Sequence, residues 1–179
     1  MSVLRPAVPD DAPALAAVHV AGWRAGYRGL VRDDYLDALD PSAREARWRT
    51  TASGPDGVLV VEEDGALVAL CAFGPCRDDD LPDEAGEVRS LYVLPEHWGT
   101  GVGGRLLAAA TAELLAVGAD EPPVLWALTG NTRARRFYER RGWLPDGTTR
   151  VVERAELDGV PAVTFPEVRH RLTAAGAQE

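Results

Sequence analysis

The sequence predicts an α/β (α+β) fold: a single mixed, mostly antiparallel central sheet with helices on both faces, in the order βααβββαβαββ. Three observations predict it. Short apolar runs bounded by turn residues alternate with longer stretches of helical periodicity. Two of the runs are joined by Asp64-Gly65, which suits a tight hairpin turn. Four glycines between positions 99 and 104 lead from an apolar run into a helical pattern.

The first half of the chain predicts a strand, two helical regions and the hairpin. Asp10 or Asp11 is the expected N-cap of the first helix, which should end near Gly22. Pro41 can break the second helical region, because proline removes a helical hydrogen bond. The expected spans are 2–6, 10–22, 33–51 and 58–74.

The second half predicts a strand, a helix after the glycines, another strand and helix, and two final strands. Asn131 suits the N-cap of the later helix, and Gly142 suits its C-terminal stop. The expected spans are 87–93, 101–117, 124–129, 131–142, 148–156 and 160–171. We expect one domain over 1–172 and a frayed tail over 173–179.

Composition narrows the class of protein. No apolar run approaches the roughly 20 residues of a membrane span, and the N-terminus lacks the apolar region of a secretory signal, so we predict a cytoplasmic protein. The net charge of -9 disfavours nucleic acid as a partner and favours a cationic one, such as an amine. All 19 basic residues are arginine, which excludes a lysine Schiff base. The two cysteines form no metal-binding pattern.

The stretch PEHWGTGVGGRLL predicts a site for an anion. A helix N-terminus has unpaired N–H groups and a positive dipole end, and glycines allow a phosphate to approach that backbone. The alternative is that the glycines only permit close helix–sheet packing. The spacing of Gly99, Gly101 and Gly104 also fits a dinucleotide fingerprint. That match is weak, because 95–98 separates the glycines from the strand and the next strand ends without an acidic residue.

Together with a second motif, NTRARRFYERRGW, the glycine stretch resembles the GCN5-related N-acetyltransferases. The glycines resemble that family's Arg/Gln-x-x-Gly-x-Gly/Ala pattern, and HVAGWRAGYRGLVRDDYLDAL looks like its first-helix region. Trp98 departs from the usual arginine or glutamine, and Trp143 replaces the commoner phenylalanine. The resemblance covers about residues 2–172. Five residues match the family's later motif one by one: Asn131, Ala134, Phe137, Tyr138 and Gly142.

The resemblance implies acetyl-CoA as co-substrate and no metal. It implies that the glycine stretch holds the pyrophosphate, with Arg105 adding a charge, and that a bulged strand presents its backbone to the pantetheine arm. Asn131 is expected to bond that arm. The residues implied in cofactor binding are Leu91, Tyr92, Val93, Trp98, Gly99, Thr100, Gly101, Val102, Gly103, Gly104, Arg105, Asn131, Ala134 and Phe137.

The resemblance also implies direct acetyl transfer in a ternary complex. Tyr138 is the expected general acid for the departing thiolate, and the N–H of Val93 the expected oxyanion donor. Glu87 matches the place of a catalytic glutamate in some members; otherwise it pairs with Arg89. His19 is the alternative base, because its reference pKa is the most suitable. An amine that binds already deprotonated would need no single base.

Trp23 and Tyr27 lie one helical turn apart, and with His19 they are candidates to line the acceptor site. The acidic residues at 33–34 and 78–80 either attract a cationic acceptor or are solvated. The expected acceptor is a small primary amine. The alternatives are a protein N-terminus or lysine, a longer acyl donor, and a catalytically silent acyl-CoA-binding module. Homodimers are common in this family, so a homodimer stays open.

Overall fold

A seven-stranded sheet organises the computed structural model, which describes residues 1–82, 84–117, 121–157 and 159–173. Its strand order is β1-β2-β3-β4-β5-β7-β6, with β4 and β5 parallel and the other neighbouring pairs antiparallel. The predicted fold class is confirmed. The strands are β1 (Ser2–Pro6), β2 (Gly57–Glu63), β3 (Ala66–Pro75), β4 (Gly86–Val93), β5 (Val124–Leu128), β6 (Trp143–Arg154) and β7 (Val163–Leu172).

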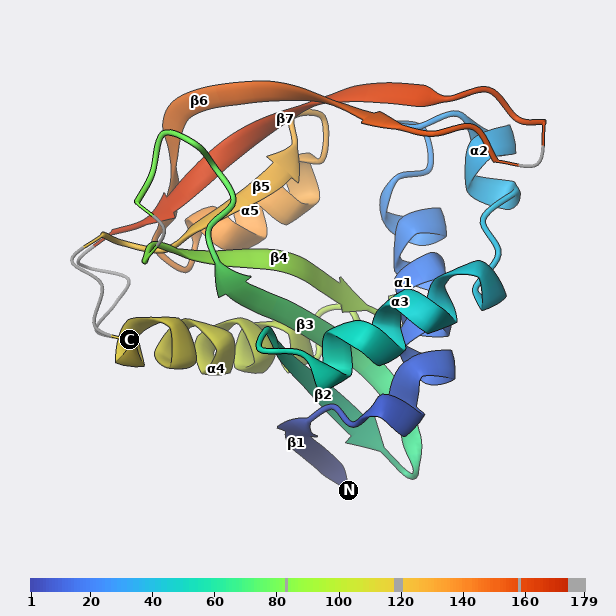
Figure 1. Ribbon diagram of the computed structural model, residues 1–179, viewed down its shortest axis with the longest axis horizontal. Helices are drawn as coiled ribbons and strands as arrows, with labels where there is room; N and C mark the ends of the chain where they lie inside the picture. The colour runs from blue at the N-terminus through green and yellow to red at the C-terminus, as the bar shows by residue number, and fades with distance from the viewer. Residues whose placement is uncertain (83, 118–120, 158, 174–179) are drawn as a thin grey trace.

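Helices cover both faces of this sheet (Figure 1). Helices α1, α2 and α3 pack on one face, where α1 and α3 share a core with β2 and β3. The other face is covered by α4, which shares a second core with β2 to β5. No helix within the described ranges has the length and apolar character to cross a membrane. The helices are η1 (Pro9–Asp11), α1 (Ala12–Gly26), α2 (Asp33–Asp37), α3 (Ser42–Ser53), η2 (Pro95–His97), α4 (Val102–Ala116) and α5 (Thr132–Glu139).

Local signals predicted the first half well, with two corrections. Asp64 and Gly65 both have positive φ, as the tight turn requires, and Pro41 separates α2 from α3. Asp11 occupies the predicted N-cap position of α1, but its carboxylate bonds Arg5 and the N–H of Val8 and makes no capping hydrogen bond to the helix. Helix α1 also continues beyond Gly22, whose missing side chain lets the helix pack directly on a ring of β4.

The last two strands form a long hairpin that reaches over α2 (Figure 1). Strand β6 begins at Trp143, five residues earlier than the sequence predicts, and its pairing with β7 shifts between Pro145 and Thr149. The Tyr35 hydroxyl of α2 donates to the carbonyl of Ala155 at 3.2 Å, which ties the far end of the hairpin to the helical layer. The predicted tail, apart from residue 173, lies outside the described residues.

The parallel pair β4 and β5 separates after a short contact. Glu87 and Val88 are the β4 residues that pair with β5, whereas β4 stays paired with β3 as far as Val93. Arg89 is an extra residue on β4, because the pairing with β3 moves from Val88 directly to Ser90. The two strands therefore diverge, and the second half of β4 has one backbone edge without a strand partner.

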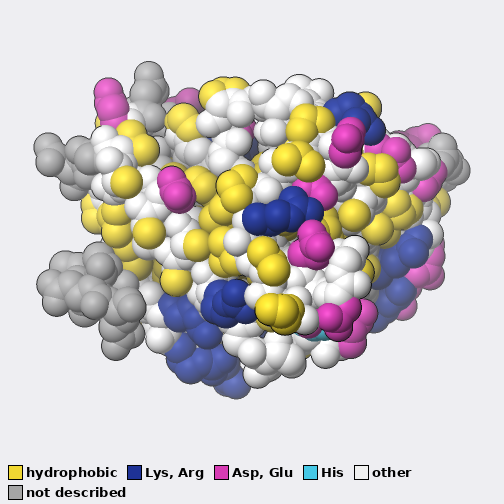
Figure 2. Space-filling model, turned by 90° about the horizontal axis from the view of Figure 1, so that it is seen from below, with side chains coloured by type: hydrophobic (Ala, Val, Ile, Leu, Met, Phe, Trp, Pro, Cys, Tyr) yellow, Lys and Arg dark blue, Asp and Glu magenta, His cyan; other side chains and the backbone are white. Residues whose placement is uncertain are grey.

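The acidic loop after β3 is tied into the fold by arginines. Asp78 lies 3.1 Å from Arg169, which is only 3% exposed, and 3.5 Å from Arg150, and it accepts a hydrogen bond from Trp126. Asp80 also pairs with Arg169, at 2.7 Å. The face in Figure 2 carries both basic and acidic side chains. Asp78 and Asp80 are thus both engaged by Arg169, Asp78 from a largely buried position and Asp80 from an exposed one.

We expect Asp78→Asn to lower the free energy of unfolding by about 2 kcal/mol, since it leaves part of the charge of the buried Arg169 uncompensated. The change is measured from the midpoint of urea denaturation. Asp79→Asn is the matched control, because Asp79 is exposed and surface changes of this kind stay within about 0.5 kcal/mol. Equal midpoints for the two variants would contradict the structural role of Asp78.

Candidate active site

The glycine stretch forms the turn between η2 and α4. Gly99 and Gly101 have φ values of +79° and +92°, which side-chain-bearing residues rarely adopt. Gly103 and Gly104 allow close packing, since a Cβ would lie 3.3 Å from Val93 and 2.8 Å from the guanidinium end of Arg141 respectively. The sequence left two explanations for the glycines open. An exposed backbone fits Gly99 and Gly101, and close packing fits Gly103 and Gly104.

The start of α4 leaves a row of backbone donors without a protein acceptor. The first helical bond is donated by the N–H of Arg105 to the carbonyl of Gly101, at 3.1 Å. Within the described chain, the N–H groups of residues 101–104 have no hydrogen-bond partner. These four donors lie at the positive end of the helix dipole, where an anion is stabilised.

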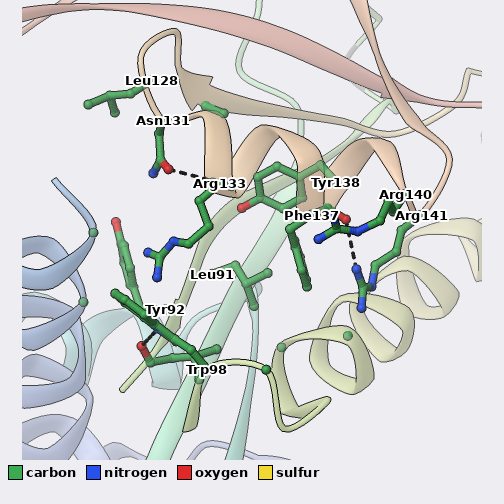
Figure 3. Close-up of a pocket in the computed structure, with 18 of the residues that line it drawn as sticks. Leu91, Tyr92, Trp98, Leu128, Asn131, Arg133, Phe137, Tyr138, Arg140 and Arg141 are labelled. Atoms are coloured by element: carbon green, nitrogen blue, oxygen red, sulfur yellow. Dashed lines mark hydrogen bonds between the residues drawn. The ribbon is translucent and has the colours of Figure 1, made fainter. Parts of the chain in front are cut away.

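A cavity of about 390 Å³ extends from this row of donors into the gap between β4 and β5. Its walls come from the glycine turn, the end of α1, the diverging strands and helix α5 (Figure 3). Sequence segments more than 100 residues apart thus meet in one hollow. Of the predicted site residues, those that line it are Tyr27, Leu91, Tyr92, Val93, Trp98, Gly99, Gly101, Gly103, Gly104, Asn131, Ala134, Phe137 and Tyr138.

Trp98 takes a structural place at the cavity wall. Its indole Nε1 donates to the carbonyl of Val93 at 2.8 Å, which holds the turn against the end of β4. The guanidinium of Arg133 stacks on the indole, 3.3 Å from the ring centre (Figure 3). Trp98, which departs from the family pattern, therefore holds the positively charged Arg133 at this wall.

The end of β4 directs a backbone donor into the gap. The N–H of Leu94 donates to the carbonyl of Val68 on β3 at 2.9 Å. Successive residues of an antiparallel strand point their polar groups to opposite sides, so the N–H of Val93 points away from β3 and towards the gap. The bulge that the resemblance implies is present at Arg89, four residues before Val93.

Three arginines give the cavity a positive rim that sequence reasoning missed: Arg133, Arg140 and Arg141. None of the three forms an ion pair within the part of the chain that the structure describes. Burial lowers the pKa of Arg133 and Arg141, so their charge is held at a cost that an anionic ligand would offset. Arg105 lies elsewhere, with its guanidinium donating to Ser2 at 2.9 Å, so its predicted place beside the turn is wrong.

We expect Arg133→Gln, Arg140→Gln and Arg141→Gln each to weaken acetyl-CoA binding about 3- to 10-fold, more at low salt than at high salt. Arg136→Gln is the matched control, since Arg136 lies on the same helix and is exposed outside the cavity. Titration calorimetry at two salt concentrations measures the effect. Equal affinities for the control and all three rim variants would show that the rim does not contact the ligand.

Tyr138 stands at the inner end of the cavity. Its hydroxyl points from α5 into the space between Arg133 and Leu91 (Figure 3). Burial raises the pKa of the phenol well above its usual value, with smaller contributions from Cys71 and Tyr92. The group is therefore neutral and keeps its proton at physiological pH. A protonated phenol aimed into a cavity suits a general acid.

Helix α5 is positioned by its N-cap. The side-chain oxygen of Asn131 accepts a hydrogen bond from the N–H of Ala134 at 3.1 Å, so the cap prediction is confirmed. Its amide nitrogen is left to face the cavity, which Asn131 lines. The oxygen of the Asn131 side chain can therefore cap the helix while its nitrogen donates to a ligand.

Two expected bases lie outside the cavity lining. The Glu87 carboxylate is 3% exposed and is held by Arg77 at 3.1 Å and Arg89 at 3.7 Å. His19 is enclosed by aromatic rings, with the Tyr92 ring centre 4.7 Å away. Burial, with smaller contributions from nearby arginines, lowers the pKa of His19 to about 3, so the imidazole is neutral at any physiological pH.

The remaining predicted residues are near the cavity without lining it. Trp23 is buried, and its Nε1 donates to the Tyr92 hydroxyl at 2.8 Å, so it supports a lining residue. The Thr100 hydroxyl donates to the carbonyl of His97, and Val102, the first residue of α4, points into the buried core. Lining residues that the sequence analysis did not single out are Gly22, Gly26, His97, Trp126, Ala127, Leu128, Arg133, Arg140 and Arg141.

Comparisons with known proteins agree with this architecture. The sequence model described as Acetyltransferase (GNAT) family matches residues 23–143. A probable N-acetyltransferase of Mycobacterium tuberculosis is 30% identical over 172 residues, covering 94% of this chain and 92% of the relative. The crystal structure of the PaiA N-acetyltransferase from Thermoplasma acidophilum, a complex with coenzyme A, superimposes with a TM-score of 0.70 at 18% identity, over 96% of this chain and 99% of that one. YncA from Salmonella typhimurium, a putative acetyltransferase solved with acetyl-CoA, gives 0.64 at 22% identity, over 97% and 95%.

Proposed function

The chain belongs to the acetyltransferase (GNAT) family and is an acetyl-CoA-dependent N-acetyltransferase, and we propose that its acceptor is the primary amine of a small molecule. Transfer is direct, in a ternary complex, without an acyl-enzyme. The observation that carries the proposal is the cavity itself, which joins unpartnered amides at one end to a protonated phenol at the other.

Acetyl-CoA supplies the activated acetyl group, and the residues present fit it. Its pyrophosphate would lie against the N–H groups of 101–104, with the positive rim of three arginines nearby. Its pantetheine arm would enter the gap between β4 and β5, where the free edge of β4 offers backbone groups and Asn131 offers an amide. This local positive charge explains how a protein of net charge -9 can attract an anionic co-substrate.

Three groups serve the transfer step. The amine nitrogen attacks the thioester carbonyl, and the N–H of Val93, which points into the gap, would stabilise the resulting oxyanion. As the carbon–sulfur bond breaks, the Tyr138 hydroxyl would give its proton to the thiolate. The proton lost by the amine returns to Tyr138 through solvent, which restores the phenol.

The proposal assigns no side chain as an essential base. His19 has too low a pKa to accept a proton at neutral pH, and Glu87 is held by two arginines away from the cavity lining. Of the possibilities that the sequence left open for deprotonating the amine, the one that remains is an acceptor that binds in its neutral form. A cavity wall with positive charge supports this, because it disfavours an ammonium group beside it.

A small acceptor is supported by the enclosure on the α1 side. The end of α1, helix α2 and the β6–β7 hairpin share a hydrophobic cluster that includes Trp23, Tyr35 and Phe165. The hydrogen bond from Tyr35 to Ala155 ties α2 to the hairpin on the same side. A protein or long peptide acceptor would need an open groove, whereas an amine of a few heavy atoms needs only the space beside Tyr27 and Tyr92.

The test is to incubate the protein with acetyl-CoA and a panel of small amines and to follow free thiol. Release that depends on one class of small amine supports the proposal. Acetyl-CoA binding without turnover on any amine would point to a silent binding module. Release only with a peptide N-terminus or lysine would instead assign a protein acceptor. Competition between acetyl-CoA and longer acyl-CoA compounds fixes the donor.

A further inference from the structure

A second group of arginines lies around His19 and Tyr35. Arg44 and Arg47 lie on the first turns of α3, and Arg154 ends β6. Together they form what we call the arginine triad, Arg44, Arg47 and Arg154. No carboxylate pairs with any of the three in the described part of the chain, although ten of the chain's 19 arginines do form ion pairs there.

The triad faces a floor of aromatic rings. The Arg154 guanidinium lies 6.0 Å from the ring centre of Trp23 and 5.8 Å from that of Phe165. Arg44 precedes Trp48 by one helical turn, and the Trp48 ring meets the imidazole of His19 at 5.7 Å. One polar atom among these rings is unsatisfied: the buried His19 Nδ1 has no hydrogen-bond partner among the described residues.

Positive charge dominates this region. All three arginines contribute, after burial, to lowering the pKa of His19, and Arg44 and Arg154 oppose the rise that burial causes in the pKa of Tyr35. Burial also lowers the pKa of the half-buried Arg44 itself. Arg47 and Arg154 are exposed, whereas Arg44 is half-buried. Arginine is seldom withdrawn from water without a partner, so Arg44 in particular is suited to an anion that the described residues do not supply.

The acidic residues that might have attracted a cationic acceptor do not offset this charge. Asp33 pairs with Arg28 at 3.2 Å, and Asp34 pairs with Arg32. Asp78 and Asp80 are held by Arg169. These four carboxylates are engaged by other arginines. Asp40 lies near enough to Arg44 for that charge to contribute to lowering the pKa of Asp40, but it forms no ion pair with the triad.

Tyr92 connects the triad to the proposed reaction centre. It lines the cavity, and its hydroxyl accepts the hydrogen bond from Trp23, whose ring centre lies 6.0 Å from the Arg154 guanidinium. An acceptor whose amine lies in the cavity beside Tyr92 would reach Arg154 by extending past Trp23.

We propose that the acceptor is a small amine that also carries a carboxylate, which Arg44 and Arg154 bind while Arg47 adds to the positive field. This inference rests on the proposed function and specifies the acceptor class of the same site. Guanidinium groups are suited to it because they bind carboxylates through paired, charge-assisted hydrogen bonds. An amine without an anionic group would leave the triad unpaired.

The experiment compares α-, β- and γ-amino acids with their amides, which keep the amine and lose the negative charge. For the wild-type protein we expect kcat/KM for the best acid to exceed that of its amide about 10- to 100-fold. Arg44→Gln and Arg154→Gln should each lower the value for the acid about tenfold and leave the value for the amide unchanged. Acetyl-CoA affinity, measured by calorimetry, should stay at the wild-type level in both variants.

Arg49→Gln is the matched control, because it removes the same charge from the same helix at an exposed residue that pairs with Asp10. Equal losses for acid and amide, equal rates for acid and amide in the wild type, or no turnover of any acid would each overturn the inference. Undetectable acetyl-CoA binding by the wild-type protein would overturn the proposed function instead. The two failures are therefore distinguishable.

Discussion

Gly101→Glu is expected to weaken acetyl-CoA binding at least about 100-fold. The new carboxylate would stand at the row of N–H donors where the pyrophosphate is proposed to lie, and like charges about 4 Å apart repel by about 4 kcal/mol at an effective dielectric of 20. No other described atom lies within 4 Å of a Cβ built at Gly101, so the free protein has room for the side chain. The penalty should therefore fall on the ligand, and titration calorimetry measures it.

Two further variants separate charge from backbone strain. Gly147→Glu is matched, because Gly147 has the same φ of +92° and open space around it but lies on β6, away from the cavity. It should show the same strain of about 1–2 kcal/mol in unfolding and normal acetyl-CoA affinity. Gly101→Gln should fall between the two in affinity. If Gly101→Glu binds acetyl-CoA as tightly as Gly147→Glu does, the anion site is somewhere else.

Tyr138→Phe is expected to lower kcat about 100-fold while acetyl-CoA affinity changes little, since general acid catalysis contributes about 10²- to 10⁴-fold. The substitution removes only the hydroxyl that points into the cavity, and it keeps the ring against Phe137 and His170. Because burial raises the pKa of the phenol above its usual value, the wild-type acid stays protonated and active to beyond pH 10.

Calorimetry and steady-state kinetics on the same preparation check this expectation. A loss of affinity equal to the loss of turnover would mean that the hydroxyl acts in binding, and unchanged turnover would exclude it as the acid. A donor thiol with a lower pKa needs less help from an acid, so an acetyl-thioester of that kind should recover part of the lost rate. Failure of that recovery, with kcat still reduced, would favour a positioning role for Tyr138.

The features that could be predicted from the sequence are those encoded within a few residues. The turn at Asp64-Gly65, the cap at Asn131 and the donor row after Gly101 each depend on local backbone chemistry, and all three were predicted. The order of strands and helices followed from periodicity in the same way. Boundaries moved where packing overrode local signals, as at Gly22, where a ring of β4 replaces the missing side chain and α1 continues.

The features that could not be predicted depend on contacts between distant segments. The rim arginine Arg141 reaches the glycine turn because α5 packs beside α4, and its neighbours in sequence give no sign of this. Arg105 directly follows the glycines in the first turn of α4, yet its guanidinium donates to Ser2. His19 suits a base by its reference pKa, but burial under aromatic rings removes its basicity. Burial and strand divergence arise from the whole sheet, so one motif cannot specify them.

The most direct test is the crystal structure of this protein with bound acetyl-CoA. The account predicts diphosphate oxygens about 2.7–3.2 Å from the N–H groups of 101–104, and the thioester between β4 and β5 beside the Tyr138 hydroxyl. A cofactor bound elsewhere, or a diphosphate that faces solvent while those amides find a protein acceptor, would contradict it.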